Sequence, residues 1–123
     1  MREILFRGKR IDNNKWIYGD FVSDGCWICH TEYLNEYGDV GDLYHQVVSE
    51  TVGQFTGLTD KNGKKIFEGD IVKDITDGVP REVFYCNESA MFLKKGILRS
   101  SLGNPLHLEV IGNIHDNPEL LGG

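Results

Sequence analysis

The alternation of apolar and polar residues predicts a chain built from short β-strands. Apolar residues recur at every second position in many short stretches, which is the period of a half-buried strand. Gly, Asn, Asp or Pro residues separate most of these stretches, and these residue types favour turns. The predicted strands cover residues 4–6, 15–22, 27–33, 44–48, 51–57, 65–72, 81–85, 91–94 and 106–114.

Two places depart from this pattern. Gly19-Asp20 interrupts the alternation of residues 15–22, which predicts a bulge or a sharp bend. Near the C-terminus, Asn117 and Pro118 stand where an N-cap and a first helical residue would stand, and Glu119 follows in the first turn. This order predicts a short helical turn.

Residues 12–22 and 60–72 resemble each other. Each segment has an Asx-rich turn, a lysine, apolar residues and then a Gly-Asp-apolar-Val step. Duplication and convergent hairpin chemistry both explain this likeness. In the second copy, Asn62-Gly63 predicts a type I′ hairpin, and the Gly69-Asp70 step is typical of a strand that turns into the wall of a small SH3-like barrel. We expect an N-terminal β-rich part over residues 1–58 and an SH3-like barrel over residues 59–123.

Composition places the chain among ordinary globular proteins. Of its 123 residues, 40% are hydrophobic and 26% are charged, as in folded soluble domains. Charged residues interrupt the first ten positions, so no signal peptide is predicted. No apolar run approaches the roughly 18 residues that a membrane span needs. We therefore expect a cytoplasmic protein with no membrane contact.

The stretch Cys26-Trp27-Ile28-Cys29-His30 matches the C-x-x-C-H pattern of c-type haem attachment. That haem is normally attached outside the cytoplasm, which conflicts with the expected location. A closed zinc site normally takes four ligands, and the only other cysteine is Cys86. We interpret the stretch as strand residues and expect no cofactor there. The alternative is a metal site formed by Cys26, Cys29 and His30.

Charge is unevenly distributed along the chain. The formal net charge is −6, and no Lys or Arg lies between Lys15 and Lys61. The carboxylates of this region are Asp20, Asp24, Glu32, Glu36, Asp39, Asp42, Glu50 and Asp60. Such a block repels a phosphate backbone, so nucleic-acid binding is not expected there. The block is interpreted as a solvated face or as one that meets basic groups of another subunit or protein.

Several segments together resemble the YopX-like proteins of phages and prophages. They are residues 1–10 with 16–20, residues 51–72 and residues 110–121. The resemblance implies a mainly β protein with a C-terminal SH3-like part, and a source in Gram-positive phages or prophages, but it implies no reaction. The residues that carry it, or that we expect to shape the strands, are Trp16, Gly19, Asp20, Gly53, Gly57, Asp60, Gly63, Phe67, Glu68, Gly69, Asp70, Gly112, Asn113, His115, Asn117 and Pro118.

Three functions are compatible with these features of the sequence. We assign no catalytic, cofactor-binding or metal-binding residue. The first is a protein-interaction module that forms a homo-oligomer through open strand edges and binds a phage or host protein. The second is a single-stranded nucleic-acid binder that uses aromatic residues as a stacking platform. Its candidates are Trp16, Tyr18, Phe55 and Phe67. The third is a metal-dependent hydrolase with Glu68, Asp70, His115 and Asp116. Trp16 and Phe67 are also expected to be core anchors.

Overall fold

The computed structural model describes residues 4–33, 35–86, 91–94, 100–101 and 105–122. The chain divides into two compact units, Met1–Gln54 and Phe55–Gly123. The boundary falls inside strand β5 (Gly53–Thr59), a little before the predicted boundary at residues 58–59. β5 contributes its first residues to the N-terminal unit and the rest to the C-terminal unit.

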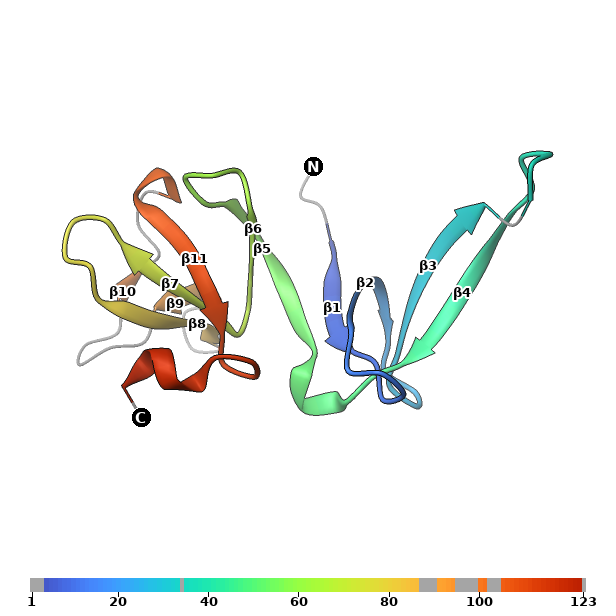
Figure 1. Ribbon diagram of the computed structural model, residues 1–123, viewed down its shortest axis with the longest axis horizontal. Helices are drawn as coiled ribbons and strands as arrows, with labels where there is room; N and C mark the ends of the chain where they lie inside the picture. The colour runs from blue at the N-terminus through green and yellow to red at the C-terminus, as the bar shows by residue number, and fades with distance from the viewer. Residues whose placement is uncertain (1–3, 34, 87–90, 95–99, 102–104, 123) are drawn as a thin grey trace. The chain divides into compact units, whose positions relative to one another are not determined.

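The N-terminal unit is an antiparallel sheet in the order β4-β3-β2-β1-β5 (Figure 1). Its other strands are β1 (Phe6–Lys9), β2 (Trp16–Val22), β3 (Trp27–Tyr33) and β4 (Val40–Gln46), and a 3-10 turn, η1 (Ser49–Thr51), precedes β5. On one face, the rings of Phe6 and Phe21 lie 5.6 Å apart, and Ile28, which pairs with Phe21, is fully buried. The alternation of residues 15–33 therefore places buried and half-buried apolar side chains on this face.

β2 runs through Gly19-Asp20 without a register shift, so of the predicted bulge or sharp bend, the bulge is wrong. The strand pairs with β1 up to Gly19 and with β3 from Asp20 onward. A Cβ atom on Gly19 would lie 2.2 Å from the carbonyl oxygen of Cys29. Glycine is needed here because two backbones approach closely.

The C-terminal unit contains a five-stranded antiparallel sheet in the order β10-β9-β8-β7-β11, while β5 pairs with β6. The strands are β6 (Lys65–Phe67), β7 (Asp70–Asp74), β8 (Pro80–Cys86), β9 (Met91–Lys94), β10 (Ser100–Ser101) and β11 (Leu108–Asn113), with 3-10 turns η2 (Pro105–His107) and η3 (Pro118–Leu121). Ile66, Val72, Val83 and Leu108 form its buried core. Leu58, Phe92 and Val110 pack around them.

The strand predicted over residues 65–72 is two strands, because the chain turns at Glu68-Gly69. Gly69 has a φ of 91°, a conformation that glycine adopts without the cost of a Cβ clash. The carboxylate of Asp70 accepts a hydrogen bond from the Phe67 N–H at 2.7 Å and closes the turn. The resemblance to residues 12–22 therefore does not extend to conformation, since Gly19 lies in mid-strand.

The prediction of a mainly β protein is confirmed, and the structure shows that its sheets are antiparallel. In the described residues no strand pairing closes the C-terminal sheet into a barrel, so the SH3-like barrel is not confirmed. The predicted C-terminal helical turn forms as η3, a 3-10 helix with Pro118 as its first residue. No helix among the described residues is long and apolar enough to cross a membrane.

Candidate functional site

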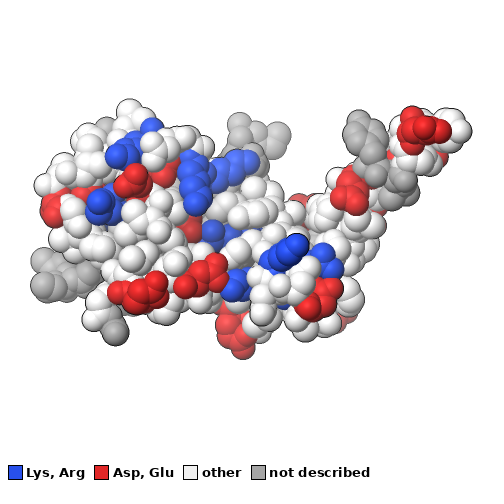
Figure 2. Space-filling model, viewed as in Figure 1, with Lys and Arg blue, Asp and Glu red and all other residues white. Residues whose placement is uncertain are grey.

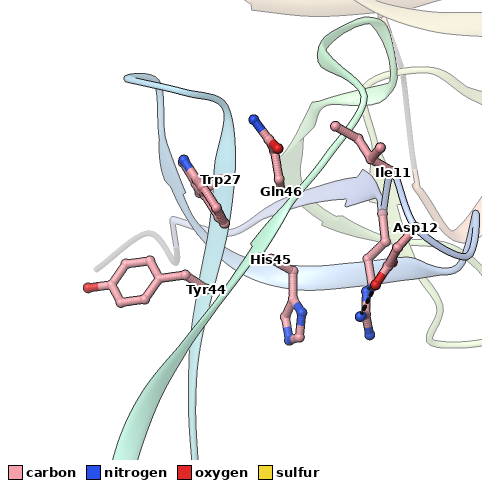
Figure 3. Close-up of a pocket in the computed structure, with 7 residues that line it drawn as sticks. Ile11, Asp12, Trp27, Tyr44, His45 and Gln46 are labelled. Carbon is pink, nitrogen blue, oxygen red and sulfur yellow. Dashed lines mark hydrogen bonds and ion pairs between the residues drawn. The ribbon is translucent and has the colours of Figure 1, made fainter.

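A cavity of about 350 Å³ lies at one end of the β3–β4 hairpin in the N-terminal unit (Figure 3). Its walls come from the β1–β2 turn and from the facing ends of β3 and β4. The lining residues are Arg10, Ile11, Asp12, Trp27, Tyr44, His45 and Gln46. This mixture of aromatic rings, an imidazole, an amide and an ion pair is the kind of surface that recognises polar or peptide ligands.

Arg10 and Asp12 form a two-pronged ion pair at the rim of this cavity. The Arg10 Nη2 and Nε atoms donate to the two carboxylate oxygens of Asp12, at 2.6 and 2.9 Å. The hydrogen bond from Arg10 lowers the pKa of Asp12 below its usual value, and the positive charge of Arg10 adds to this effect. Asp12 is therefore ionised at neutral pH and holds Arg10 in place.

The face of the sheet opposite Ile28 carries partly exposed aromatic and aliphatic side chains. Strand pairing places Trp27 next to Val22, and Cys29 next to Tyr44. A hydrogen bond with Cys29 raises the pKa of Tyr44, and the charge of Asp42 adds to the shift. Tyr18 and Tyr44 are 48% and 55% exposed. We call the side chains of this face that are exposed, Tyr18, Val22, Val40 and Tyr44, together with the half-buried Trp27, the outer patch.

Sequence reasoning did not single out Tyr44, Val40 or the cavity. The strand predicted over residues 44–48 begins too late, because Asn, Gly and Asp are frequent in the residues before it, whereas β4 begins at Val40. The signal that was present is the alternation of Val40, Asp42, Tyr44 and Gln46, whose side chains are all exposed. The intervening residues of β4 are half-buried.

The structure does not bring Cys26, Cys29 and His30 together as a metal site. Cys29 and His30 are consecutive in β3, so their side chains point to opposite faces. Cys26 precedes the strand and has a φ of 61°. His30 stacks on His45, with ring centroids 5.3 Å apart. Within the described part of the chain, no group of three or more His, Cys, Asp or Glu residues is placed to hold a metal ion.

Asp60 is buried in the turn between β5 and β6. Its carboxylate accepts hydrogen bonds from the N–H groups of Asn62, Lys64 and Val110 at 2.8, 2.9 and 2.9 Å. Burial acts to raise the pKa of Asp60, but these three donors outweigh it and hold the pKa below its usual value. Only Gly63 of the Asn62-Gly63 pair has a positive φ, so the predicted type I′ turn is wrong.

The other glycines of the resemblance have distinct positions. Gly53 pairs with Arg7 of β1. Gly57 has a φ of 89°, and it lies where the register between β5 and β6 shifts. The Thr56 hydroxyl donates to the Ile66 carbonyl at 2.9 Å across this shift. These positions fix the path of β5 and present no reactive group.

The segment from Gly112 to Asn117 is held by hydrogen bonds between its own side chains and backbone. The Asn113 side-chain oxygen accepts hydrogen bonds from the N–H groups of His115 and Asp116 at 3.0 and 2.9 Å. Asn117 stands at the predicted N-cap of η3, but its side chain makes no cap bond and instead accepts from the Asn113 N–H at 3.2 Å. A Cβ on Gly112 would lie 2.6 Å from this Asn117 oxygen. Gly112, Asn113 and Asn117 therefore have structural roles in shaping this turn.

The hydrolase candidates lie on neighbouring segments, because the Ile114 N–H donates to the Gly69 carbonyl at 2.9 Å. Asp70, however, is 1% exposed and bonded to backbone. The predicted stacking platform is split as well. Phe55 and Phe67 are buried in the C-terminal unit with rings 5.6 Å apart, whereas Trp16 is half-buried, with the Arg7 guanidinium 4.7 Å from its ring centroid.

Comparison with known proteins identifies the family. The model of the YopX protein family matches residues 5–122, so the chain belongs to the YopX family. The crystal structure of protein EF1440 from Enterococcus faecalis is similar over 98% of this chain and 99% of that one, with a TM-score of 0.64 and 24% identity. This likeness supports the fold. No curated protein matches the chain significantly.

Proposed function

We propose that this protein is a cytoplasmic, phage- or prophage-encoded accessory protein that binds another protein through the outer patch of its N-terminal unit. The observation that carries the proposal is the exposure of apolar and aromatic side chains on β4. Val40 is 57% exposed and Tyr44 is 55% exposed, and the cavity adjoins Tyr44. Aromatic side chains beside a cavity are frequent anchors of protein interfaces.

In this proposal the C-terminal unit is a scaffold of the SH3-like type. Core residues from β6, β7, β8 and β11 meet in one cluster, with Leu58 of β5 packed against it. Such an arrangement is compatible with a partly open small barrel. The motif residues Asp60 and Asp70 stabilise turns of this unit, as their backbone hydrogen bonds indicate.

The test is capture of a partner from a nuclease-treated lysate of Gram-positive cells that carry the phage. We expect one stoichiometric protein with the tagged wild-type chain, and its loss with Tyr44→Ser. The matched control is Tyr85→Ser, which changes an exposed tyrosine of β8 that is 41% exposed. Capture that is unaffected by Tyr44→Ser would exclude the outer patch as the binding surface. If the chain captures only nucleic acid, and only from lysate that was not treated with nuclease, the nucleic-acid hypothesis would be favoured.

A further inference from the structure

β4 is the last strand on its side of the N-terminal sheet, and the direction of its backbone groups follows from two hydrogen bonds. The Val47 N–H donates to the Cys26 carbonyl at 3.0 Å, toward β3. The Gln46 carbonyl accepts from the Ile11 N–H at 3.1 Å, on the other side. Because these directions alternate along an antiparallel strand, the N–H and C=O groups of Val40, Asp42 and Tyr44 point away from β3.

These outward groups form an open edge. Among the described residues, none donates to or accepts from the backbone groups of Val40, Asp42 or Tyr44 on this side. The edge ends at Gln46, where Ile11 of the β1–β2 turn closes it. An open edge of this kind is a template for an added strand. The ligand that fits the edge is therefore an extended peptide segment.

The charge of the hairpin indicates which segment fits. Residues 27–46 contain no Lys or Arg, and they contain Glu32, Glu36, Asp39 and Asp42, all of them exposed. In Figure 2 the outer part of this hairpin shows red and white side chains and no blue ones. A second copy of β4 would bring two hairpins of like charge together, whereas a basic segment would neutralise one.

The side chains next to the edge specify the pattern of the segment further. Asp42 and Tyr44 are two residues apart and share a face of the sheet. A basic side chain opposite Asp42 would form a cross-strand ion pair, and an Arg opposite Tyr44 would stack on its ring. Leu43, on the other face, is half-buried and favours an apolar neighbour. The matching sequence therefore alternates basic and apolar residues.

We propose that the β4 edge binds a basic, extended segment of the partner protein, with Lys or Arg at alternate positions, as an additional antiparallel strand. The added strand covers Val40 to Tyr44, and its end next to Gln46 faces the cavity lined by Arg10 and Asp12 (Figure 3). This inference rests on the proposed function, and it specifies the chemistry of the partner and the mode of binding.

The experiment uses the full chain and blocked heptapeptides. One peptide alternates Arg or Lys with Val; a second has Glu in place of the basic residues, and a third has the same composition as the first with its basic residues contiguous. We expect amide hydrogen exchange, followed by NMR, to slow at Val40, Asp42 and Tyr44 with the first peptide alone. Unchanged exchange at these three amides would overturn the proposal.

Variants of the chain separate the contributions of charge and backbone. Asp42→Asn should weaken the binding of the alternating peptide about two- to fivefold, while Glu50→Gln, an equal change of charge in η1, should leave it unchanged. Val40→Pro removes an outward N–H that the fold does not use, and it should weaken binding about tenfold or more. Equal binding by Val40→Pro and the wild type would overturn pairing at the edge.

A peptide that is N-methylated at the residues facing β4 tests the same pairing with the protein unaltered, and it should not bind. Sedimentation of the chain without peptide tests whether a second copy of the chain occupies the β4 edge. The sequence predicts a homo-oligomer through open strand edges, but the like charges of two β4 hairpins disfavour one at this edge, so we expect no self-association through β4. A dimer that Val40→Pro dissociates would assign the edge to a second copy and overturn the proposal. If capture from lysate depends on Tyr44 but the edge amides stay unprotected, the proposed function stands and this inference fails.

Discussion

The carboxylate of Asp60 accepts a hydrogen bond at 2.9 Å from the N–H of Val110, fifty residues later in the chain. The bond ties the β5–β6 turn to β11, and the same side chain holds Asn62 and Lys64. We expect Asp60→Ala to lower the free energy of unfolding by about 3 kcal/mol, because three backbone donors lose their acceptor in a buried turn. Urea unfolding measures this loss.

The matched control for Asp60 is Asp12→Ala. Asp12 holds the corresponding place in the similar segment 12–22, yet its side chain is 64% exposed. Its removal should change the free energy of unfolding by no more than about 0.5 kcal/mol. If the two substitutions changed the free energy of unfolding equally, the hydrogen bonds that Asp60 accepts would not be the reason for its effect on stability.

Gly19 and Gly69 should respond differently to substitution, although each precedes an aspartate. Gly69 needs a positive φ, which Asn tolerates better than Ala, so Gly69→Asn should be less destabilising than Gly69→Ala. At Gly19 any Cβ meets the Cys29 carbonyl oxygen, so Gly19→Asn should be at least as destabilising as Gly19→Ala. Melting temperatures of the four variants test both statements, and the same order at both sites would contradict them.

Asp74 makes the stability of the protein depend on pH in the acidic range. Hydrogen bonds from Thr76 and Lys94 lower the pKa of Asp74 to about 2. The unfolded chain, in which this carboxyl has a pKa of about 3.9, therefore takes up its proton at higher pH than the folded chain. The stabilisation is complete above about pH 5 and is lost as the pH falls through 4 toward 2.

Asp74→Asn tests this assignment through the pH dependence of unfolding. We expect the variant to be less stable at pH 7 and to lose less stability than the wild type between pH 4 and pH 2. Denaturant unfolding at a series of pH values gives both quantities. A variant with the same acid dependence as the wild type would mean that other carboxylates account for it.

The thiols of Cys26 and Cys29 should not bind a divalent metal together with His30. The side chains of Cys29 and His30 point to opposite faces of the sheet, so one ion cannot reach both without disruption of β3. We expect no thiolate-to-metal absorption when Co²⁺ is added to the reduced protein. Absorption that disappears in Cys29→Ser would contradict the strand geometry.

Much of the fold follows from local patterns in the sequence. The bounds of β3 and β9 are those that the alternation predicts, because turn-forming residues flank regular strands there. The Gly-Asp steps could not be resolved in this way. Identical letters at 19–20 and 69–70 correspond to a close backbone approach and to a turn, and the difference depends on contacts with Cys29 and Phe67.

The candidate site was harder to predict than the fold. The acidic block was visible in the sequence, but its relation to an open strand edge depends on the order of strands in the sheet. Strand order arises from pairings between residues far apart in the chain, such as Arg7 with Gly53. The polar start of β4 also masked a strand, since an edge strand with exposed side chains needs little apolar sequence.

The most direct test of binding through the N-terminal unit is hydrogen exchange, read by mass spectrometry, on the chain bound to its captured partner. Binding should slow exchange in residues 40–46 and leave exchange in the C-terminal sheet unchanged. Protection confined to the strands of the C-terminal unit, with residues 40–46 unaffected, would contradict a binding surface on the N-terminal unit.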